Sequence, residues 1–527
     1  MRITNKIMQN NSLSNINANK VTQDKLNTMM STQKKITKPS DDPVIAIRAL
    51  RLRSSVSQIT QYYEKNVPDA QSWLKVTEDS LNNVTSVLTS MIEQVTMGST
   101  ECLKTTDREF IIEQLKALRS ELYATGDADY AGRYIFTGYR TDTSLSFTEA
   151  TTKKYTITEQ LDASVIDQIT HINTKIGGTG TKSITDLNDS NYNTADYSGI
   201  TEQNSVNSTQ VYRIRLAYDN CTDDTADAPV IQYTNEYGAT KTYTAEIAHS
   251  YDTTDPYEEI AKAGNEDKVI FLADTGELLL GSNVYSNLIN TKDFVNTSSK
   301  DEGEIRITYS KSSWEKNDLR PQHYFYCVDE EGVEYNPHYL EYGHSRQSME
   351  YDVGFNQTIE INTTADECYT HDIGREVDDL VAAMQQMVDI EKTISMLEDT
   401  MKSLSESDTD YDTKMATLQA QLDAANKAQT LIKENVEVEF TAGITAMQGF
   451  LNQTNVALTN CGTRGAKLDL IESRLMSQQT TFETLQSENE DADITEVAIK
   501  LNSAELTYEA SLMATGKIMQ NSLLNFI

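Results

Sequence analysis

The fold is decided by the stretch from residue 45 to residue 95, which reads IAIRALRLRSSVSQITQYYEKNVPDAQSWLKVTEDSLNNVTSVLTSMIEQV. Its apolar positions recur at alternating steps of four and three residues, the spacing of a heptad seam on an α-helix, with one irregularity near residue 70. The seam comprises Ala49, Leu52, Val56, Ile59, Tyr63, Ala70, Leu74, Thr77, Leu81, Val84, Leu88, Met91 and Val95. We therefore predict about 50 residues of helix, about 75 Å at 1.5 Å per residue, packed in a helical bundle.

Local signals mark the start of this helix and one weak point within it. The run Pro39-Ser40-Asp41-Asp42-Pro43 lies directly before the seam. Proline disfavours helix in the residue before it but fits the first helical position, so we predict Asp42 as the N-cap and Pro43 as the first helical residue. Pro68 lies near the irregularity, where it should kink the helix or split it in two.

The chain as a whole reads as helix, then β structure, then helix again. Residues 146–370 are rich in Thr, Asp, Asn and Tyr, with short alternating stretches and frequent turn residues. We predict an α+β multidomain protein in which residues 41–145 and 371–485 form a helical core. Residues 146–370 then form one or two inserted, outward β-rich domains.

The two ends, residues 1–40 and 486–527, are apolar at helical spacing but carry many Asn, Ser, Thr and Gln between the apolar positions. Neither end alone buries enough surface to offset the entropy of ordering it. We predict that these terminal helices are disordered in the monomer and become ordered by packing against further copies of the chain. The candidate assembly residues are Ile3, Ile7, Leu13, Ile16, Leu26, Leu501, Tyr508, Leu512 and Ile518.

Charge favours pairing of the two ends with each other. Residues 1–40 contain seven Lys or Arg and one acid, a balance of +6, whereas residues 486–527 contain seven acids and two Lys, a balance of −5. Opposite charges favour adjacent helices, although exposed ion pairs individually contribute little. Asp493, with Glu496 three residues later, predicts the N-cap of the last helix, and residues 488–492 read as a solvated break before it.

Composition excludes several classes of function. The net charge of −35 argues against a nucleic-acid surface or an anionic membrane as the main partner. Five widely spread cysteines give no disulfide framework, and no stretch reaches the roughly 18 apolar residues of a membrane span. The N-terminus lacks the apolar region of a cleavable signal peptide.

No catalytic or metal site is predicted, and no cofactor. His338, Glu341 and His344 have residue types of a zinc protease, but their spacing puts the histidines about 240° apart on a helix. His323 with Cys327 alternates like a strand, where four residues span about 13 Å, too far for two ligands of one zinc ion. We interpret these residues, and Cys368 with His371, as ordinary packing, and we do not expect an enzyme.

Several motifs resemble the hook–filament junction proteins of the flagellin superfamily. Residues 38–43 are similar to that family's N-terminal signature, and the segment around Arg133, Phe136 and Gly138 is similar to its exit from the helical core. Arg464, Asp491 and Asp493 lie in a C-terminal region that also resembles the family. The likeness covers roughly residues 1–145 and 430–527. One departure is visible, because the family usually has Ser-Gly before its basic residues, whereas this chain has Ser31-Thr32-Gln33-Lys34-Lys35, which puts the flexible bend there in doubt.

The resemblance implies a structural subunit of the bacterial flagellum that polymerises through its terminal helices. It implies an extracellular location, reached by type III export without a cleavable signal. The implied partners are hook-associated protein 1 on the hook side, flagellin on the filament side, an export chaperone and neighbouring copies in a ring. Two alternatives stay open: a flagellin filament subunit, and a free coiled-coil or adhesin-type surface protein.

Overall fold

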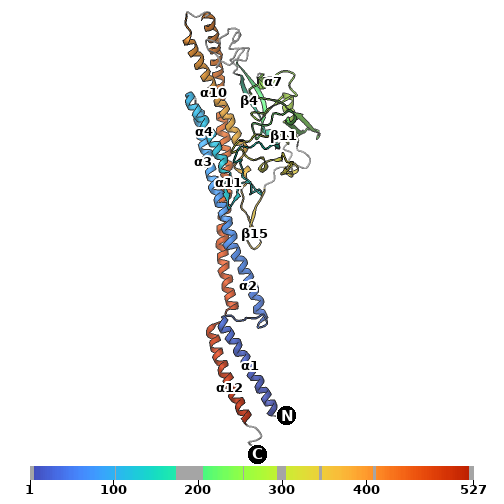
Figure 1. Ribbon diagram of the computed structural model, residues 1–527, viewed down its shortest axis with the longest axis vertical. Helices are drawn as coiled ribbons and strands as arrows, with labels where there is room; N and C mark the ends of the chain where they lie inside the picture. The colour runs from blue at the N-terminus through green and yellow to red at the C-terminus, as the bar shows by residue number, and fades with distance from the viewer. Residues whose placement is uncertain are drawn as a thin grey trace, which may run out of the picture. The chain divides into compact units, whose positions relative to one another are not determined.

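The structure is a computed structural model that describes residues 5–100, 103–173, 206–252, 254–292, 304–342, 347–406 and 411–520 (Figure 1). The chain divides into two compact units, which we describe separately. The terminal unit contains residues 1–71, 351–359 and 465–527, and the central unit contains residues 72–350 and 360–464. The division falls within two long helices, α3 (Val67–Gly98) and α11 (Tyr411–Glu490).

The terminal unit is helical apart from the tip of one hairpin. Besides parts of α3 and α11, it contains α1 (Asn5–Thr32), α2 (Pro43–Gln61), a π-helical turn (Tyr62–Asn66) and α12 (Ile494–Gln520). Helix α2 begins as the sequence predicts: the carboxylate of Asp42 accepts hydrogen bonds from the backbone N–H groups of Val44 and Ile45, at 2.9 and 3.2 Å, and Pro43 is the first helical residue. The cap satisfies two donors that have no partner within the helix.

The predicted heptad seam is confirmed as a buried face. Ala49 and Ile59 are buried in α2, and every seam residue of α3 from Ala70 to Val95 is buried, including the hydroxyl-bearing Thr77. Leu52, Val56 and Tyr63 are half-buried. The buried hydroxyl of Thr77 donates to the carbonyl of Trp73, 2.9 Å away, so its burial leaves no polar group without a partner.

The irregularity near Pro68 takes the form of a π-helical turn. The widened turn Tyr62–Asn66 separates α2 from α3, with helical backbone angles on both sides. Pro68 has no N–H to donate to the preceding turn, and a π turn places one extra residue into the helical path at such a site. The predicted split between two helices is therefore present, and the chain stays helical across it.

The long helices of the central unit, in the part of the chain that the structure describes, are most of α3, α4 (Thr105–Thr125), α10 (His371–Ser403) and α11 up to Arg464. Helices α4 and α10 lie side by side (Figure 1). Thr105 donates a hydrogen bond to Glu391 at 2.7 Å, and Arg119 pairs with Asp378.

The β structure of the central unit forms two sheets. The six-stranded sheet has the order β13-β12-β3-β11-β6-β7, and the five-stranded sheet has the order β4-β5-β10-β9-β8. Neighbouring strands are antiparallel except for β8 and β9. The strands are β3 (Tyr155–Leu161), β4 (Ile166–Asn173), β5 (Asn207–Arg215), β6 (Val230–Thr234), β7 (Thr240–Thr244), β8 (Glu246–Ala248), β9 (Val269–Leu272), β10 (Glu277–Leu280), β11 (Ile305–Lys311), β12 (Tyr326–Asp329) and β13 (Glu334–Tyr335).

One apolar core joins the two sheets. It contains Ile157 and Ile307 from the six-stranded sheet and Ile214, Phe271 and Leu278 from the five-stranded sheet. The other face of the five-stranded sheet carries a smaller core around Val211 and Leu279, covered by α7 (Pro256–Ile260). The sequence left one or two β domains open, and the shared core shows that the two sheets form one body. The predicted α+β class is confirmed.

Several short elements complete the described chain. They are β1 (Asp129–Tyr130), β2 (Arg133–Tyr134), α8 (Ser282–Leu288), α9 (Tyr339–Tyr342), β14 (Glu350–Gly354), β15 (Gln357–Glu360) and 3-10 turns at 163–165, 225–227, 321–323 and 365–367. Among the described helices, none combines the length and the apolar character that crossing a lipid bilayer requires.

Candidate assembly interface

The segments that follow α1 and precede α12 are joined by backbone hydrogen bonds. Lys34 and Asp491 form an antiparallel bridge. The N–H of Lys35 donates to the carbonyl of Glu490 at 2.7 Å, and the N–H of Ala492 donates to the carbonyl of Gln33 at 2.9 Å. The structure thus ties the N-terminal helix to the C-terminal helix through a short ladder, which we call the terminal bridge (residues 33–35 and 490–492).

Ion pairs reinforce the terminal bridge. Lys34 pairs with Asp491, and Arg53 of α2 donates from Nε to the carboxylate of Glu490 at 2.7 Å. The hydrogen bond from Lys34, followed by one from Ser487, lowers the pKa of Asp491. Lys35 also reaches the carbonyl of Glu488.

The prediction of a solvated break at residues 488–492 is wrong for Glu490. Helix α11 continues through Glu490, whose side chain is only 3% exposed. A carboxylate buried without a partner would be costly, and here Arg53 and Lys34 approach it from the N-terminal part of the chain. We predicted that this acidic run is solvated because the cations that pair with Glu490 lie more than 400 residues away in the sequence.

Gln33 makes the bend that the family's glycine would be expected to make. Its φ is 57°, in the left-handed region that side chains other than glycine rarely adopt. The bend allows the chain to leave α1 and enter the terminal bridge at the next residue. The departure from Ser-Gly seen in the sequence therefore keeps the turn and adds backbone strain to it.

The signature Pro39-Ser40-Asp41-Asp42-Pro43 forms the turn between the terminal bridge and α2. The backbone N–H groups of Thr37 and Lys38 donate to Asp41 Oδ2 at 3.2 and 3.0 Å. These hydrogen bonds, that from Lys38 foremost, lower the pKa of Asp41. The two aspartates therefore have separate tasks: Asp41 closes the turn, and Asp42 caps α2.

Helix α12 begins with the predicted cap. Asp493 accepts hydrogen bonds from the N–H groups of Thr495 and Glu496 at 2.9 and 3.2 Å. Its first turn contains the acidic Glu496, which favours the positive end of the helix dipole. The predicted start of the last helix is confirmed.

Helices α1 and α12 lie side by side along their length (Figure 1). Each helix presents one face on which side chains are buried or half-buried at steps of three and four residues, the spacing of a two-helix seam. These positions are Gln9, Ser12, Ile16, Asn19, Gln23 and Leu26 on α1, and Val497, Leu501, Ala504, Tyr508, Ser511 and Thr515 on α12. The amide of Asn19 donates to the hydroxyl of Ser511 at 2.9 Å within this seam.

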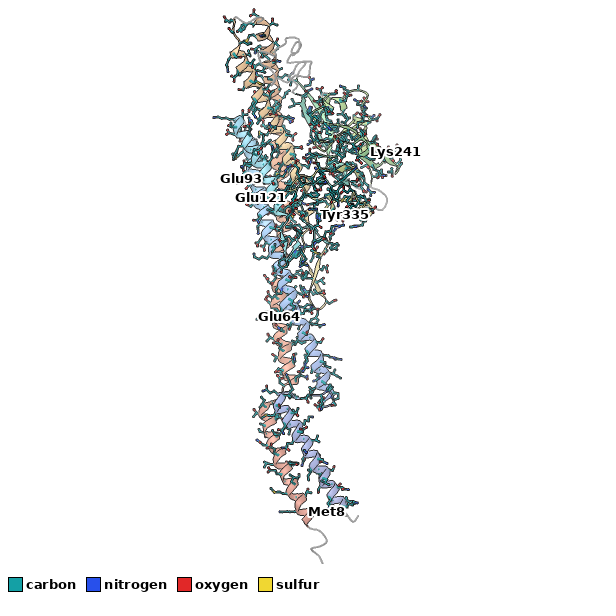
Figure 2. All side chains as sticks on the ribbon, in the orientation of Figure 1. Met8, Glu64, Glu93, Glu121, Lys241 and Tyr335 are labelled. Carbon is teal, nitrogen blue, oxygen red and sulfur yellow. The ribbon has the colours of Figure 1, made fainter. Side chains whose placement is uncertain are left out.

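The predicted assembly residues divide between this seam and the surface. Ile16, Leu26, Leu501 and Tyr508 lie at half-buried seam positions. Ile7, Leu13 and Leu512 are 49%, 54% and 44% exposed, as is the nearby Met8 at 40% (Figure 2). Ile3 and the side chain of Ile518 lie outside the described residues.

Sequence reasoning missed the polar half of the seam. Gln9, Ser12, Asn19 and Gln23 share the spacing of Ile16 and Leu26, so the periodicity was present in the sequence. A search restricted to apolar positions could not detect it. The two helices of one chain consequently meet through a largely polar α1 face, while several large apolar side chains stay exposed.

The remaining signature residues, Arg133, Phe136, Gly138 and Arg464, belong to the central unit. They contact the segments that connect its helices to its strands. The guanidinium of Arg133 lies 5.0 Å from the ring centre of Trp73, and the buried Phe136 packs edge-on against Tyr369. Gly138 has φ +62°, and a Cβ there would lie 2.3 Å from the side chain of Gln347.

Arg464, in α11, donates to the carbonyl of Asn362 at 2.7 Å and to Glu360 at 3.0 Å. These contacts join the helix to the last residue of β15 and to the segment that follows it. Arg464, like Arg133, Phe136 and Gly138, therefore makes structural contacts between the helices and the segments that lead into or out of the β region.

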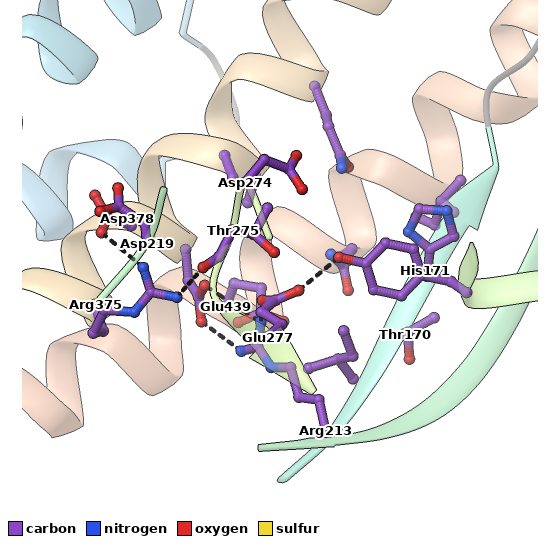
Figure 3. A pocket seen from close by; sticks show the side chains of 18 residues that line it. Thr170, His171, Arg213, Asp219, Asp274, Thr275, Glu277, Arg375, Asp378 and Glu439 are labelled. Carbon is purple, nitrogen blue, oxygen red and sulfur yellow. Dashed lines mark hydrogen bonds and ion pairs between the residues drawn. The ribbon is translucent and has the colours of Figure 1, made fainter. Parts of the chain in front are cut away.

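A cluster of charged side chains lies where the five-stranded sheet meets α10 (Figure 3). Arg213 of β5 is 7% exposed and pairs with Asp167, Glu277 and Asp379. Burial alone would raise the pKa of Asp379, but Arg213 and Arg215 hold it below its ordinary value. We call this set, Arg213, Arg215, Asp167, Glu277 and Asp379, the ionic cluster.

A cavity of about 290 Å³ adjoins the ionic cluster and is lined by His171, Arg375, Asp378 and Glu439 among others (Figure 3). Arg375 is directed to the carbonyl of Thr275 and to Asp378. His171 stacks on Tyr257 and contacts Asp255 at 2.9 Å. Arg375 and His171 thus have their polar contacts with other residues of the central unit. The contact of Arg375 of α10 with the carbonyl of Thr275 helps to position the β region on α10.

Of the histidines considered as metal ligands, His323 and His371 are packed within the protein, His338 is exposed, and His344 lies outside the described residues. His371 packs against Tyr218, Tyr324 and Phe325, and burial, followed by the charge of Arg375, lowers its pKa to about 3. Burial likewise lowers the pKa of His323 to about 4. Within the described ranges, no group of three or more His, Cys, Asp or Glu side chains is arranged to hold a metal ion.

Comparison with known proteins finds relatives of the flagellum. Residues 3–141 match the family model for the bacterial flagellin N-terminal helical region. A stretch of 181 residues is 30% identical to flagellar hook-associated protein 3 of Salmonella typhimurium, and equally to that of Escherichia coli, covering 33% of this chain and 56% of each relative. The chain thus matches little more than half the length of these curated relatives.

Among solved structures, Xanthomonas campestris FlgL is 13% identical, covers 83% of this chain and 99% of its own, and gives a TM-score of 0.27. The family model and the curated relatives confirm the resemblance predicted from the sequence: residues 3–141 are similar to the bacterial flagellin N-terminal helical region, and the chain is similar to flagellar hook-associated protein 3.

Proposed function

We propose that this chain is a structural subunit of the bacterial flagellum that joins the hook-side junction protein to the flagellin filament. The observation that carries the proposal is the 30% identity to flagellar hook-associated protein 3 over 181 residues. The paired terminal helices support it, because they expose apolar side chains on both helices and are held together by a largely polar α1 face. Such helices gain stability when further copies surround them.

The same proposal assigns partners and a location. Hook-associated protein 1 lies on the hook side, flagellin lies on the filament side, and an export chaperone binds the chain before secretion. The subunit acts outside the cell, in a ring of copies related by head-to-tail contacts. The central unit supports a structural role, because its buried Arg213 is engaged with three carboxylates of the same unit.

Deletion of the gene with complementation tests this function. Cells without the protein should build hooks, fail to grow filaments and release flagellin into the medium, and the wild-type gene should restore filaments. Filament growth in the deletion strain contradicts the proposal.

Immunogold labelling separates the junction subunit from the alternative, a filament subunit. An antibody against the β region should label one band between hook and filament. Label along the whole filament would identify a filament subunit instead.

A further inference from the structure

The π-helical turn Tyr62–Asn66 is the irregular point of the helical path from α2 to α3. The N–H of Val67 donates to the carbonyl of Tyr62, five residues earlier, so one extra residue is held in this turn. Pro68 comes next and has no N–H to donate to the turn before it. Single π turns within helices are frequent at functional sites, so the contacts that hold this one indicate what it does.

The hairpin formed by β14 and β15 contacts both ends of the π turn. At its tip, Phe355 packs edge-on against Tyr62, the first residue of the turn, with the ring centres 5.8 Å apart. Asn66, the last residue of the turn, donates from its side chain to the carbonyl of Asp352 at 2.8 Å. One element outside the helical path therefore holds the beginning and the end of the turn together.

The same hairpin also reaches the start of α3 and the helix α11. The hydroxyl of Tyr351 donates to the carboxylate of Asp69, the third residue of α3, at 2.5 Å. Arg474 of α11 donates to the side-chain oxygen of Gln357 on β15. All of these residues belong to the terminal unit. The hairpin therefore spans the irregular stretch from residue 62 to residue 69 and is itself fastened to α11.

The contacts between the hairpin and the turn lie near the surface, whereas the apolar anchors of the hairpin are buried. Phe355 is 49% exposed, and Asn66 and Tyr351 are half-buried. Val353 and Ile359, in contrast, are buried. The contacts with the turn can therefore be lost and regained without exposing the buried side chains of the hairpin.

Helix α11 supports other parts of the same helical path. Gln479 donates to the hydroxyl of Thr60 at 3.3 Å, before the turn, and Gln71 donates to Glu472 at 2.9 Å, after it. The contacts from the hairpin lie between these two points in the sequence. The hairpin thus supports the part of the path in which the regular helical hydrogen bonds are interrupted.

We propose that the hairpin segment 351–359 is a strap that keeps the π turn closed, and that the turn opens locally when the strap lifts while α2 and α3 stay helical. A helix with such a joint bends at one defined place, because only the hydrogen bonds around residues 62–69 have to open. The inference goes beyond the proposed function, since it concerns the folded chain by itself and stands whether or not the chain joins hook to filament.

Hydrogen–deuterium exchange of the full chain, resolved at single amides, tests the strap. The double variant Tyr351→Phe, Phe355→Ala removes a hydrogen bond and a ring contact but keeps the buried anchors. Exchange at the Val67 amide, which closes the π turn, should become about tenfold faster. The matched control Thr358→Ala, at an exposed position of β15, should change this rate less than about twofold. Unchanged exchange at Val67 in the double variant overturns the inference.

The amide of Ile361 shows whether the hairpin itself stays folded, because it donates to the carbonyl of Met349 at the base of the hairpin, 3.0 Å away. It should exchange at the wild-type rate in the double variant. If it does not, the single variant Tyr351→Phe decides, since it removes the hydroxyl and keeps the ring. This variant should speed exchange at Val67 about threefold, and an unchanged rate overturns the inference.

Trypsin gives an independent measurement of the opening. Lys65 is exposed within the π turn, and Lys75 lies on α3 with its side chain 71% exposed. In the double variant, cleavage after Lys65 should become at least about fivefold faster, while cleavage after Lys75 stays within about twofold of the wild-type rate. Equal acceleration at both sites would mean that the helix opens as a whole, which overturns the joint.

Restoring the missing backbone donor should reverse the effect of losing the strap. Pro68→Ala supplies an N–H that can donate to the preceding turn. Added to the double variant, it should recover at least about half of the protection lost at the Val67 amide. No recovery would place the weakness elsewhere in the helix and overturn the role assigned to the strap.

Discussion

The ionic cluster of the central unit and the α1–α12 seam of the terminal unit both place polar side chains in an interface. They differ in how far these side chains are shielded from solvent. In the ionic cluster, Arg213 is enclosed and has three carboxylate partners. In the seam, Gln9 and Gln23 are only half-buried, and large apolar side chains of the same helices remain exposed. The first interface is enclosed within one molecule, whereas the second leaves apolar side chains exposed. Under the proposed function, those exposed side chains are the ones that further copies of the chain would cover.

The largest expected effect comes from breaking the ionic cluster. Arg213→Ala leaves Glu277 and Asp379 buried without their main partner, which should lower the free energy of unfolding by about 3–5 kcal/mol. Both tryptophans of the chain, Trp73 and Trp314, lie in the central unit, so tryptophan fluorescence during denaturation follows this unit.

The control for this variant is an exposed ion pair in the same sheet region. Lys268→Ala removes a partner of Glu246 whose side chain is 61% exposed, and it should change the free energy of unfolding by no more than about 0.5 kcal/mol. If Arg213→Ala were as mild as Lys268→Ala, the ionic cluster would not be holding the β region.

A pH-dependent effect is expected from Glu159 in the core between the sheets. Burial raises its pKa to about 7, although hydrogen bonds from Tyr309 and from the N–H of Ala217 favour the carboxylate. Because the folded pKa exceeds the ordinary value of 4.5, the stabilisation from the protonated form is complete below pH 4.5 and is lost as the pH rises through 7. Glu159→Gln should therefore stabilise the central unit at pH 8, by up to about 3 kcal/mol, and have little effect at pH 4.5.

Denaturation followed by tryptophan fluorescence at pH 8 and pH 4.5 measures this difference. Glu246→Gln, at an exposed site, serves as the control and should show no such dependence. A gain from Glu159→Gln that is equal at both pH values would mean that the buried carboxyl group does not titrate in this range.

In the terminal helices, unlike in the ionic cluster, replacing a polar side chain of the interface with an apolar one should increase stability. Amides of α1 and α12 should exchange with deuterium faster than those of α3 and α10 in the isolated protein. Gln23→Leu places an apolar side chain at a half-buried seam position and should slow exchange in both terminal helices about fivefold, equivalent to about 1 kcal/mol.

Asn27→Leu is the matched control, since Asn27 is exposed on the same helix. It should leave exchange nearly unchanged. Terminal helices that exchange as slowly as α3 before any substitution would contradict the prediction that they need neighbouring copies to become ordered.

The sequence predicted the helical elements well where the signal was local and periodic. The seam from Ile59 to Val95, the cap at Asp42 and the cap at Asp493 each depend on residues within one or two turns of one another. The fold class followed from the same reasoning. The roles of the candidate assembly residues remain predictions.

What the sequence could not give were contacts between distant segments. The buried position of Glu490 depends on Arg53 and Lys34, and the ionic cluster depends on Arg213 meeting Asp379 of α10. In a chain with a net charge of −35, an acidic residue reads as solvated unless its partner is known. The polar seam was missed for a related reason, because Asn19 is recognisable as a seam residue only beside Ser511.

The smallest expected effect concerns the bend at Gln33, where the terminal bridge begins. A left-handed conformation costs a residue with a side chain about 1–2 kcal/mol. Glycine avoids this cost but loses more conformational entropy on folding, so only part of the cost is recovered. Gln33→Gly should therefore strengthen the terminal bridge by up to about 1 kcal/mol, and Gln33→Val should weaken it by a similar amount.

Hydrogen exchange at the amides of Lys35 and Ala492 measures this effect directly, because these amides donate to Glu490 and Gln33 across the terminal bridge. Their hydrogen exchange should be slowest with glycine and fastest with valine. Identical exchange in all three proteins would mean that the bend is not strained, and that the terminal bridge does not depend on it.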